Sequence, residues 1–228
     1  QKVSMPCVAQ KVLEGEVPEE LHYTCTFVVP EKFHKERILL HFGAVDWQCK
    51  VYVNKKEVGG HTGGYCPFTI DITDALCEGE NELVVWVYDP TDESWQNRGK
   101  QASYSHGFWY VSTSGIWQTV WMEAVSENYI KKYKLTPDID KGVLNIETDV
   151  VGEGALKIKV LDGETVVLEK TIEAKDEVEI ENAKLWSPEN PFLYDFVLTL
   201  EKDGTETDNV KGYFAMRKFS IGEWGGYN

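Results

Sequence analysis

Residues 49–58 read CKVYVNKKEV, and this stretch decides the fold class. Its first five positions alternate between small apolar side chains and longer amphipathic ones, which is the period-two pattern of a β-strand with one buried face. The polar step at residues 54–56 predicts a hairpin turn. Residues 81–89, NELVVWVYD, keep the alternation but are apolar on both faces, which predicts a strand covered on both sides. Residues 71–76 (DITDAL) suggest a helical turn.

The second half of the chain predicts another β-rich domain. Residues 156–174, LKIKVLDGETVVLEKTIEA, predict a hairpin about Asp162–Gly163, and residues 192–208 repeat this device about Asp203–Gly204. Turns in this half recur about every 8–12 residues, which is the spacing of a β-sandwich. Because aromatic density also falls after residue 125, the sequence predicts two all-β domains in series.

Composition and charge narrow the range of partners. The chain has 228 residues, and no apolar run approaches the roughly 18 residues that a membrane helix needs, so we expect a soluble protein with no membrane partner. Its net charge of −15 argues against nucleic acid, because phosphates bind clustered Lys and Arg. The N-terminus shows no signal pattern, and the compartment is left open between cytoplasm and periplasm or secretion.

The cysteine and histidine patterns indicate no metal or cofactor. The five Cys form no C-x-x-C pair, and the five His form no H-x-x-H or H-E-x-x-H pair. We therefore expect buried thiols rather than a zinc site or a disulfide framework. The cysteines are Cys7, Cys25, Cys49, Cys66 and Cys77.

A family resemblance rests on residues 39–76 (LLHFGAVDWQCKVYVNKKEVGGHTGGYCPFTIDITDAL), 114–125 (SGIWQTVWMEAV) and 185–200 (LWSPENPFLYDFVLTL). Together with residues 212–222 (GYFAMRKFSIG), these stretches resemble the non-catalytic domains of glycoside hydrolase family 2. That family contains β-galactosidases, β-glucuronidases and β-mannosidases.

The resemblance implies a domain organisation. It implies a jelly-roll (galactose-binding-like) β-sandwich at residues 1–125, followed by an immunoglobulin-like β-sandwich at residues 126–221. Residues 222–228 would begin a linker to a catalytic TIM barrel of the same polypeptide. Because the chain lacks an initiating Met and stops where such a barrel starts, we expect it to be trimmed at both ends.

The resemblance also implies that catalysis lies outside this chain. Members are retaining β-glycosidases, whose nucleophile and acid/base carboxylates stand about 5–5.5 Å apart. Both are Glu residues on barrel strands, and no segment of this chain matches them. We therefore expect no catalytic residue here and no hydrolysis by this chain alone.

One candidate site follows from the resemblance, a jelly-roll loop that reaches the mouth of the barrel and binds the sugar. In several relatives an Asp in that loop holds a sugar hydroxyl. The matching position in SHGFWYVSTSGIW (residues 105–117) is Gly107. Specificity for galactose or glucuronic acid is therefore not carried over to this chain.

Upstream of that position, residues 90–106 (PTDESWQNRGKQASYSH) form a long stretch without periodicity, which is typical of a functional or disordered loop. Arg98, Lys100 and Gln101 can donate to sugar hydroxyls or to a carboxylate, beside aromatic rings that can face a pyranose. The alternative is a mobile basic loop whose charges pair with neighbouring Asp residues. His106 is either a partner at the rim of the pocket or an ordinary loop histidine.

Several other conspicuous residues have structural explanations. Trp47 is expected to pack in the core or at a strand end, and Asp89 to cap a turn. Trp186 is expected to pack between the domains. Residues 59–64 (GGHTGG) are expected in tight turns, and residues 114–121 (SGIWQTVW) in a buried strand.

The favoured function is therefore the accessory part of a retaining exo-β-glycosidase that acts on a β-glycoside. The chain would supply a sugar-contacting loop and orient the barrel. The alternatives are a free-standing carbohydrate-binding module and a structural tandem of β-sandwiches, which fold alone does not separate. The sugar, the linkage and the formation of homo-oligomers are left open.

Overall fold

The structure, a computed structural model, describes residues 18–33, 37–93 and 95–222. Strands dominate these ranges, and the helical element within them is the 3-10 turn η2 (Thr73–Ala75). The all-β fold class is therefore confirmed. The helical turn expected at residues 71–76 is this 3-10 turn.

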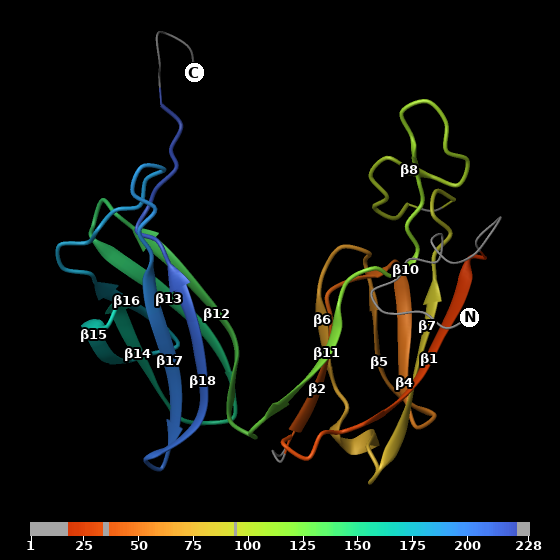
Figure 1. Ribbon diagram of the computed structural model, residues 1–228, viewed down its shortest axis with the longest axis horizontal. Helices are drawn as coiled ribbons and strands as arrows, with labels where there is room; N and C mark the ends of the chain where they lie inside the picture. Colours follow the sequence, from red (N-terminus) through yellow and green to blue (C-terminus); the bar gives the residue numbers. More distant parts are fainter. Residues whose placement is uncertain (1–17, 34–36, 94, 223–228) are drawn as a thin grey trace. The chain divides into compact units, whose positions relative to one another are not determined.

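The chain divides into two compact units, Gln1–Val125 and Ser126–Asn228 (Figure 1). Each unit has a hydrophobic core of its own. Across the part of the chain that the structure describes, no helix is long and apolar enough to cross a membrane.

The first unit consists of two antiparallel sheets that share one core. A four-stranded sheet has the order β1-β7-β4-β5, a three-stranded sheet has the order β11-β2-β6, and β3 pairs with β10. Alternate side chains from both larger sheets, among them Phe42, Val51 and Val85, are fully buried between them. The strands are β1 (Glu20–Val28), β2 (Arg37–Phe42), β3 (Val45–Asp46), β4 (Gln48–Val53), β5 (Lys56–Thr62), β6 (Phe68–Asp71), β7 (Glu80–Tyr88), β10 (Gly115–Ile116) and β11 (Val120–Val125).

The hairpin predicted at residues 54–56 is confirmed, because β4 and β5 pair with Asn54 and Lys55 as the two turn residues. The turns expected at residues 59–64 are wrong for Gly59 and Gly60, which lie inside β5. A Cβ at Gly60 would stand 2.5 Å from the carbonyl oxygen of Cys49 on β4. The glycine therefore permits close strand pairing rather than a turn.

The single buried strand expected at residues 114–121 is also wrong. The chain forms β10, leaves the sheet and re-enters it as β11. In the break, Trp117 donates its indole N–H to the carbonyl oxygen of Gly64 at 2.7 Å. The side chain therefore forms a hydrogen bond to the loop between β5 and β6 and does not lie on a strand. Trp121 is 47% exposed and stacks on His41 with ring centroids 4.9 Å apart.

The expectation of buried thiols holds only for Cys49 among the described cysteines. Cys25, Cys66 and Cys77 are exposed, since they lie on an outer strand face or in turns beside short elements. Cys7 lies outside the described residues. Burial raises the pKa of the Cys49 thiol to about 11, against the opposing effect of a backbone hydrogen bond from His61.

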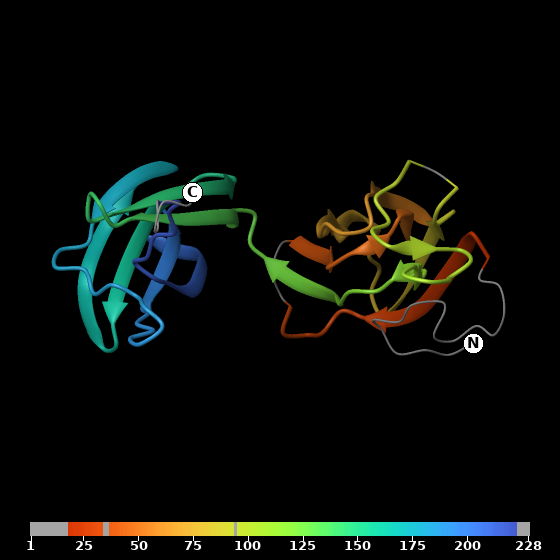
Figure 2. The same ribbon diagram turned by 90° about the horizontal axis from the view of Figure 1, so that it is seen from above.

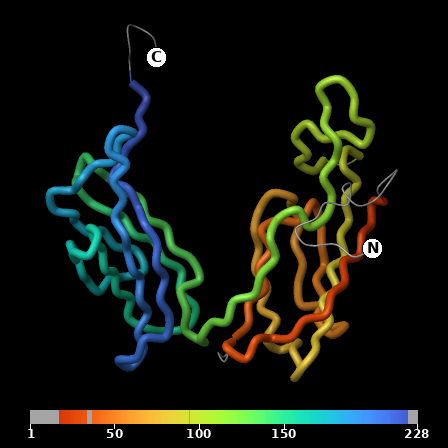
Figure 3. Tube along the Cα trace, viewed as in Figure 1, coloured from red at the N-terminus to blue at the C-terminus, as the bar shows by residue number. Residues whose placement is uncertain are grey.

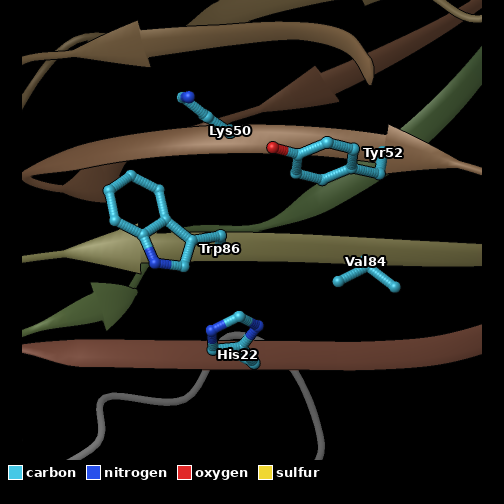
Figure 4. A pocket seen from close by; sticks show the side chains of 5 residues that line it. All are labelled: His22, Lys50, Tyr52, Val84 and Trp86. Carbon is cyan, nitrogen blue, oxygen red and sulfur yellow. The ribbon is translucent and has the colours of Figure 1, made fainter. Parts of the chain in front are cut away.

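Strand β7 is not covered on both faces within the described ranges. Val85 and Val87 point into the core, whereas Val84, Trp86 and Tyr88 on the opposite face are only half-buried. An outward cavity of about 290 Å³ lies over this second face (Figure 4). Its apolar residues therefore line a surface depression rather than a second core.

The second unit is a sandwich of a three-stranded sheet, order β12-β13-β16, and a four-stranded sheet, order β15-β14-β17-β18. Both predicted hairpins are confirmed. In the first, the central turn residues are Gly163 and Glu164, one position later than expected, because Asp162 still pairs with Thr165. The strands are β12 (Tyr129–Asp138), β13 (Val143–Val151), β14 (Ala155–Asp162), β15 (Thr165–Ile172), β16 (Lys175–Glu179), β17 (Tyr194–Lys202) and β18 (Thr205–Phe214).

Trp186 is held within the second unit. Its backbone N–H donates to the carbonyl oxygen of Met216 at 3.0 Å, and the Arg217 guanidinium lies 5.1 Å from the centre of a Trp186 ring. Packing of Trp186 against the first unit stays a prediction.

Between β7 and β10 the chain makes a long excursion, residues 89–114, which we call the long loop. It projects beyond the ends of the sandwich strands (Figure 3, yellow-green) and lies over them when the unit is seen from above (Figure 2). Within it, β8 (Gln101–Ala102) and β9 (Tyr110–Val111) form a short parallel pair. The candidate loop at residues 90–106 forms the first part of this excursion.

Candidate functional site

The two ends of the long loop are tied together by the buried carboxylate of Asp89. Its Oδ1 accepts hydrogen bonds from the Gln96 side-chain amide at 2.6 Å and from the Thr91 backbone N–H at 2.8 Å. Its Oδ2 accepts from the Ser114 hydroxyl at 2.5 Å. Asp89 is 5% exposed, and Gln96 and Ser114 are also buried. The predicted turn cap is confirmed by Thr91, and the same carboxylate also closes the loop at its base.

A second tie is made by Gln101 at the start of β8. The Thr113 backbone N–H donates to Gln101 Oε1. The Gln101 amide in turn donates to the Tyr65 hydroxyl at 2.9 Å. Because Tyr65 lies between β5 and β6, Gln101 connects both arms of the long loop to the sandwich below.

The Arg98 side chain makes its contacts within the long loop. One guanidinium nitrogen lies 3.1 Å from Asp92 Oδ2, and the guanidinium carbon lies 5.1 Å from the centre of a Trp109 ring. A side-chain hydrogen bond from Ser103, stronger in effect than desolvation, lowers the pKa of Asp92, and the Arg98 charge lowers it further. The charge of Arg98 is therefore paired with Asp92 within the loop.

Lys100, His106 and Gly107 face outward on the same loop. The Lys100 ammonium lies 5.8 Å from the centre of the Phe108 ring. His106 Nδ1 lies 2.9 Å from the carbonyl oxygen of Tyr104. Gly107 has a φ of 57°, and nothing lies within 4 Å of the place where a Cβ would stand. The space beside Gly107 is thus open and uncrowded.

The long loop also presents large apolar side chains to solvent. Each of five is more than 60% exposed, which is uncommon for so many residues on one loop. An exposed apolar group of this kind marks an interaction surface. The residues are Trp95, Tyr104, Phe108, Tyr110 and Val111.

Beneath the loop lies a buried carboxyl group, Asp46 on β3, which sequence reasoning missed. It is 3% exposed, and its Oδ1 has no hydrogen-bond partner among the described residues. A Cβ at Gly64 would overlap this oxygen, so the chain passes directly against it. Desolvation raises the pKa of Asp46 to about 7, the charge of Asp89 adds to the rise, and a hydrogen bond with Gln101 opposes it.

Trp47, the neighbour of Asp46, joins this base to the long loop. Its ring meets Trp95 edge to face with centroids 5.6 Å apart. Its indole N–H is buried and has no partner among the described residues. The expectation of strand-end packing holds for Trp47, which follows β3 directly.

The long loop and the residues beneath it form one arrangement of polar and aromatic groups. It combines a polar base, in which Asp46, Asp89 and Gln101 lie close together, with exposed aromatic rings and a lysine at the tip. Among the described residues no group of three or more His, Cys, Asp or Glu side chains could hold a metal ion. Polar groups that fix orientation beside aromatic faces are the usual composition of a site for a polar organic ligand.

The structure brings Arg98 and Gln101 together inside the long loop and leaves Lys100, His106 and Gly107 on its outside. A sequence signal for the missed base was present. Asp46 lies on β3 and Asp89 directly follows β7, and each comes at the end of an apolar run in the sequence.

Two family descriptions match this chain. Residues 2–125 match "Glycosyl hydrolases family 2, sugar binding domain", and residues 128–217 match "Glycosyl hydrolases family 2".

Curated relatives agree in family but differ in activity. A putative beta-glucuronidase of Formosa agariphila is 29% identical over 202 residues, which cover 82% of this chain and 24% of the relative. A beta-galactosidase of Clostridium acetobutylicum is 29% identical over 212 residues, which cover 87% of this chain and 23% of the relative. The chain therefore spans about a quarter of the length of these relatives.

A solved structure supports the fold. The β-glucuronidase from Ruminococcus gnavus in complex with D-glucuronic acid superposes with a TM-score of 0.81 at 21% identity, covering 95% of this chain and 40% of that one. At this identity the likeness concerns the fold alone. The jelly-roll and immunoglobulin-like sandwiches expected from the sequence are thus the folds of the two units.

Proposed function

This chain belongs to glycoside hydrolase family 2, and on that premise we propose that it forms the accessory part of a retaining exo-β-glycosidase. In this proposal the long loop contacts the sugar, and the two units orient a catalytic TIM barrel in the same polypeptide. The observation that carries it is the construction of the long loop. A buried polar base fixes a tip whose aromatic and basic side chains are exposed.

The five candidate residues have two different roles in this proposal. Arg98 and Gln101 are positioning residues, since their polar groups are engaged within the loop and with Tyr65. Lys100 and His106 contact the sugar or its substituents from the outside of the loop. Gly107 leaves room for a ligand group where several relatives have a carboxylate.

A structural tandem of sandwiches is less well supported than an accessory glycosidase part. A tandem without a ligand has no need of a long loop closed at its base by buried polar groups. Such groups need complete hydrogen bonding, and an apolar loop base of the same shape would avoid that requirement.

The test uses the full-length polypeptide with a panel of nitrophenyl β-glycosides. We expect one β-glycoside to be hydrolysed and Lys100→Ala to lower kcat/KM by about tenfold, the value of one lost charged hydrogen bond. Lys211→Ala, an exposed lysine in the second unit, is the matched control and should leave kcat/KM unchanged. Equal kcat/KM for Lys100→Ala and the wild type would contradict the proposal that the long loop contacts the sugar.

The 228-residue chain alone should not hydrolyse any glycoside of the panel, because both catalytic carboxylates are expected on the barrel. Clear turnover by the isolated chain, retained after repurification, would contradict the assignment of an accessory role.

A further inference from the structure

A second candidate ligand site lies away from the long loop, on the outer face of the β1-β7-β4-β5 sheet. Five side chains line its cavity of about 290 Å³. Figure 4 shows that they project from three adjacent strands: His22 from β1, Val84 and Trp86 from β7, and Lys50 and Tyr52 from β4. A pocket of this size is at the lower end for small-molecule sites and holds one small ring rather than an extended chain.

Strand register assembles this site. Trp86 is the pairing partner of His22 on one side and of Lys50 on the other, so the three side chains form one row across the sheet. Val84 and Tyr52 pair in the next row. Because alternate residues of a strand share a face, both rows point outward, opposite the buried Val85 and Val87.

The indole of Trp86 is the centre of the row. It is half-buried, its N–H donates to Glu20 Oε2 at 3.4 Å, and its ring plane lies 5° from that of Tyr88 with centroids 6.3 Å apart. These contacts hold the ring in place, so an aromatic face is fixed before any ligand arrives.

The groups around the indole are hydrogen-bonding groups without strong partners in the part of the chain that is described. The Lys50 ammonium lies 6.0 Å from the centre of a Trp86 ring, at the outer limit of a cation–π contact, and makes no ion pair with a described residue. Lysine, tyrosine and histidine side chains can all donate to hydroxyl oxygens.

We propose that this indole platform, defined by His22, Lys50, Tyr52, Val84 and Trp86, binds one neutral pyranose unit of a glycan. The apolar C–H face of the ring packs on Trp86, and ring hydroxyls accept hydrogen bonds from Lys50 and Tyr52. Glu20, whose Oε2 accepts the Trp86 indole N–H, adds a negative charge beside the indole, and the chain carries a net charge of −15. We therefore expect the platform to bind an anionic sugar more weakly than a neutral one. This proposal does not depend on the role of the long loop.

The experiment titrates the 228-residue chain with methyl β-D-glucopyranoside, methyl β-D-galactopyranoside and methyl β-D-glucuronide. Saturation-transfer difference spectra report binding, and ¹H–¹⁵N chemical shifts locate it. We expect at least one neutral glycoside to bind with a Kd on the order of 1 mM, and the glucuronide to bind more weakly. Shifts should centre on the Trp86 indole N–H and the backbone amides of His22 and Lys50.

Variants separate the platform from other aromatic surfaces. Trp86→Ala should abolish the saturation-transfer signal, and Lys50→Met should weaken binding about threefold while leaving the fold intact. Trp121→Ala is the matched control, since Trp121 is a half-exposed tryptophan on the other sheet of the same unit. If Trp86→Ala does not fold, Lys50→Met and the shift map still decide the matter.

Three results would overturn the proposal. They are the absence of saturation transfer with both neutral glycosides at about 20 mM, shifts confined to the long loop, and glucuronide binding as tight as that of the neutral sugars. Loss of activity in the full-length Lys100→Ala enzyme concerns the long loop and leaves the platform untouched, so the two proposals fail separately.

Discussion

The two units differ in how completely their polar side chains are paired. In the first unit, four buried side-chain atoms have no hydrogen-bond partner among the described residues: Asp46 Oδ1, Trp47 Nε1, His61 Nδ1 and Gln96 Oε1. In the described part of the second unit there is no such atom, and surface lysines pair with acidic residues across neighbouring strands, as Lys157 does with Glu201 at 2.6 Å. Unpartnered buried polar atoms are rare in native proteins and need an explanation.

The contrast suggests that the first unit carries an interaction surface, whereas the polar groups of the second unit stabilise its fold. Three of the four unpartnered atoms belong to residues at the base of the long loop or in contact with it. The second unit instead has tight hairpins and exposed ion pairs. Exposed ion pairs contribute little to the free energy of folding, but charged side chains keep the surface of a β-sheet soluble. We therefore expect substitutions of polar groups to be costly in the first unit and mild in the second.

Replacing Asp89 should have the largest effect. Asp89→Ala leaves the Gln96 amide and the Ser114 hydroxyl buried without their acceptor, so we expect the free energy of unfolding of the first unit to fall by about 4 kcal/mol. Urea unfolding followed by tryptophan fluorescence measures this loss.

Asp89→Asn is the matched control, because it keeps the size and one acceptor oxygen and should lose less. A loss below about 1 kcal/mol in Asp89→Ala would show that the base of the long loop does not depend on this carboxylate.

The pH dependence of the first unit should come next. The pKa of Asp46 is raised from 3.8 to about 7, so the folded state binds this proton more tightly than the unfolded chain does. Its contribution is complete below about pH 4 and is lost as the pH rises to about 7. We expect the free energy of unfolding to fall by roughly 3 kcal/mol over that interval.

Asp46→Asn should flatten this profile, because the amide does not titrate. Urea titrations at a series of pH values compare the two proteins. A slope between pH 4 and 7 that persists unchanged in Asp46→Asn would assign the dependence to another group.

A turn substitution in the second unit should be milder. Gly163 has a φ of 61° and nothing within 4 Å of an added Cβ, so Gly163→Ala meets only the conformational penalty of a left-handed residue. We expect a loss of about 1 kcal/mol in the unfolding transition of the second unit. Glu164→Ala, at the adjacent turn position, should be close to neutral, and a larger loss there would point to side-chain contacts instead.

The smallest effect is expected for an exposed ion pair. Lys131 Nζ lies 3.8 Å from Asp149 Oδ2, and the two side chains are 61% and 59% exposed. Asp149→Ala should change the free energy of unfolding by less than about 0.5 kcal/mol, with the change vanishing in high salt. A loss comparable to that of Asp89→Ala would break the contrast between the units.

Local patterns were sufficient to predict most of the fold. Alternation at residues 49–53 and the turn residues at 54–56 and 203–204 depend on neighbours in sequence, and the structure confirms all three. The single strand expected at residues 114–121 is wrong because Trp117 turns away to reach Gly64, a partner more than fifty residues distant. Such a tertiary contact leaves no trace in local periodicity.

The candidate site was predictable only in part. Loop length and residue types made Arg98, Lys100 and Gln101 candidates, whose role stays a prediction. Asp46 was missed because its burial and its proximity to Asp89 arise from β3, β7 and the long loop together. Likewise, the outward face of β7 looked like core in sequence, since Val84 and Trp86 are apolar whether they face a second sheet or a cavity.

The parallel pairing of β8 with β9 has a consequence for affinity. This pair and the ties at Asp89 and Gln101 close the long loop at three levels, so the backbone of its tip is ordered before any partner arrives. A loop that orders on contact loses roughly 1–2 kcal/mol of conformational entropy for each residue that it fixes. Because this entropy is already lost during folding, binding does not have to offset it. The few contacts of a single sugar ring can then give a measurable affinity.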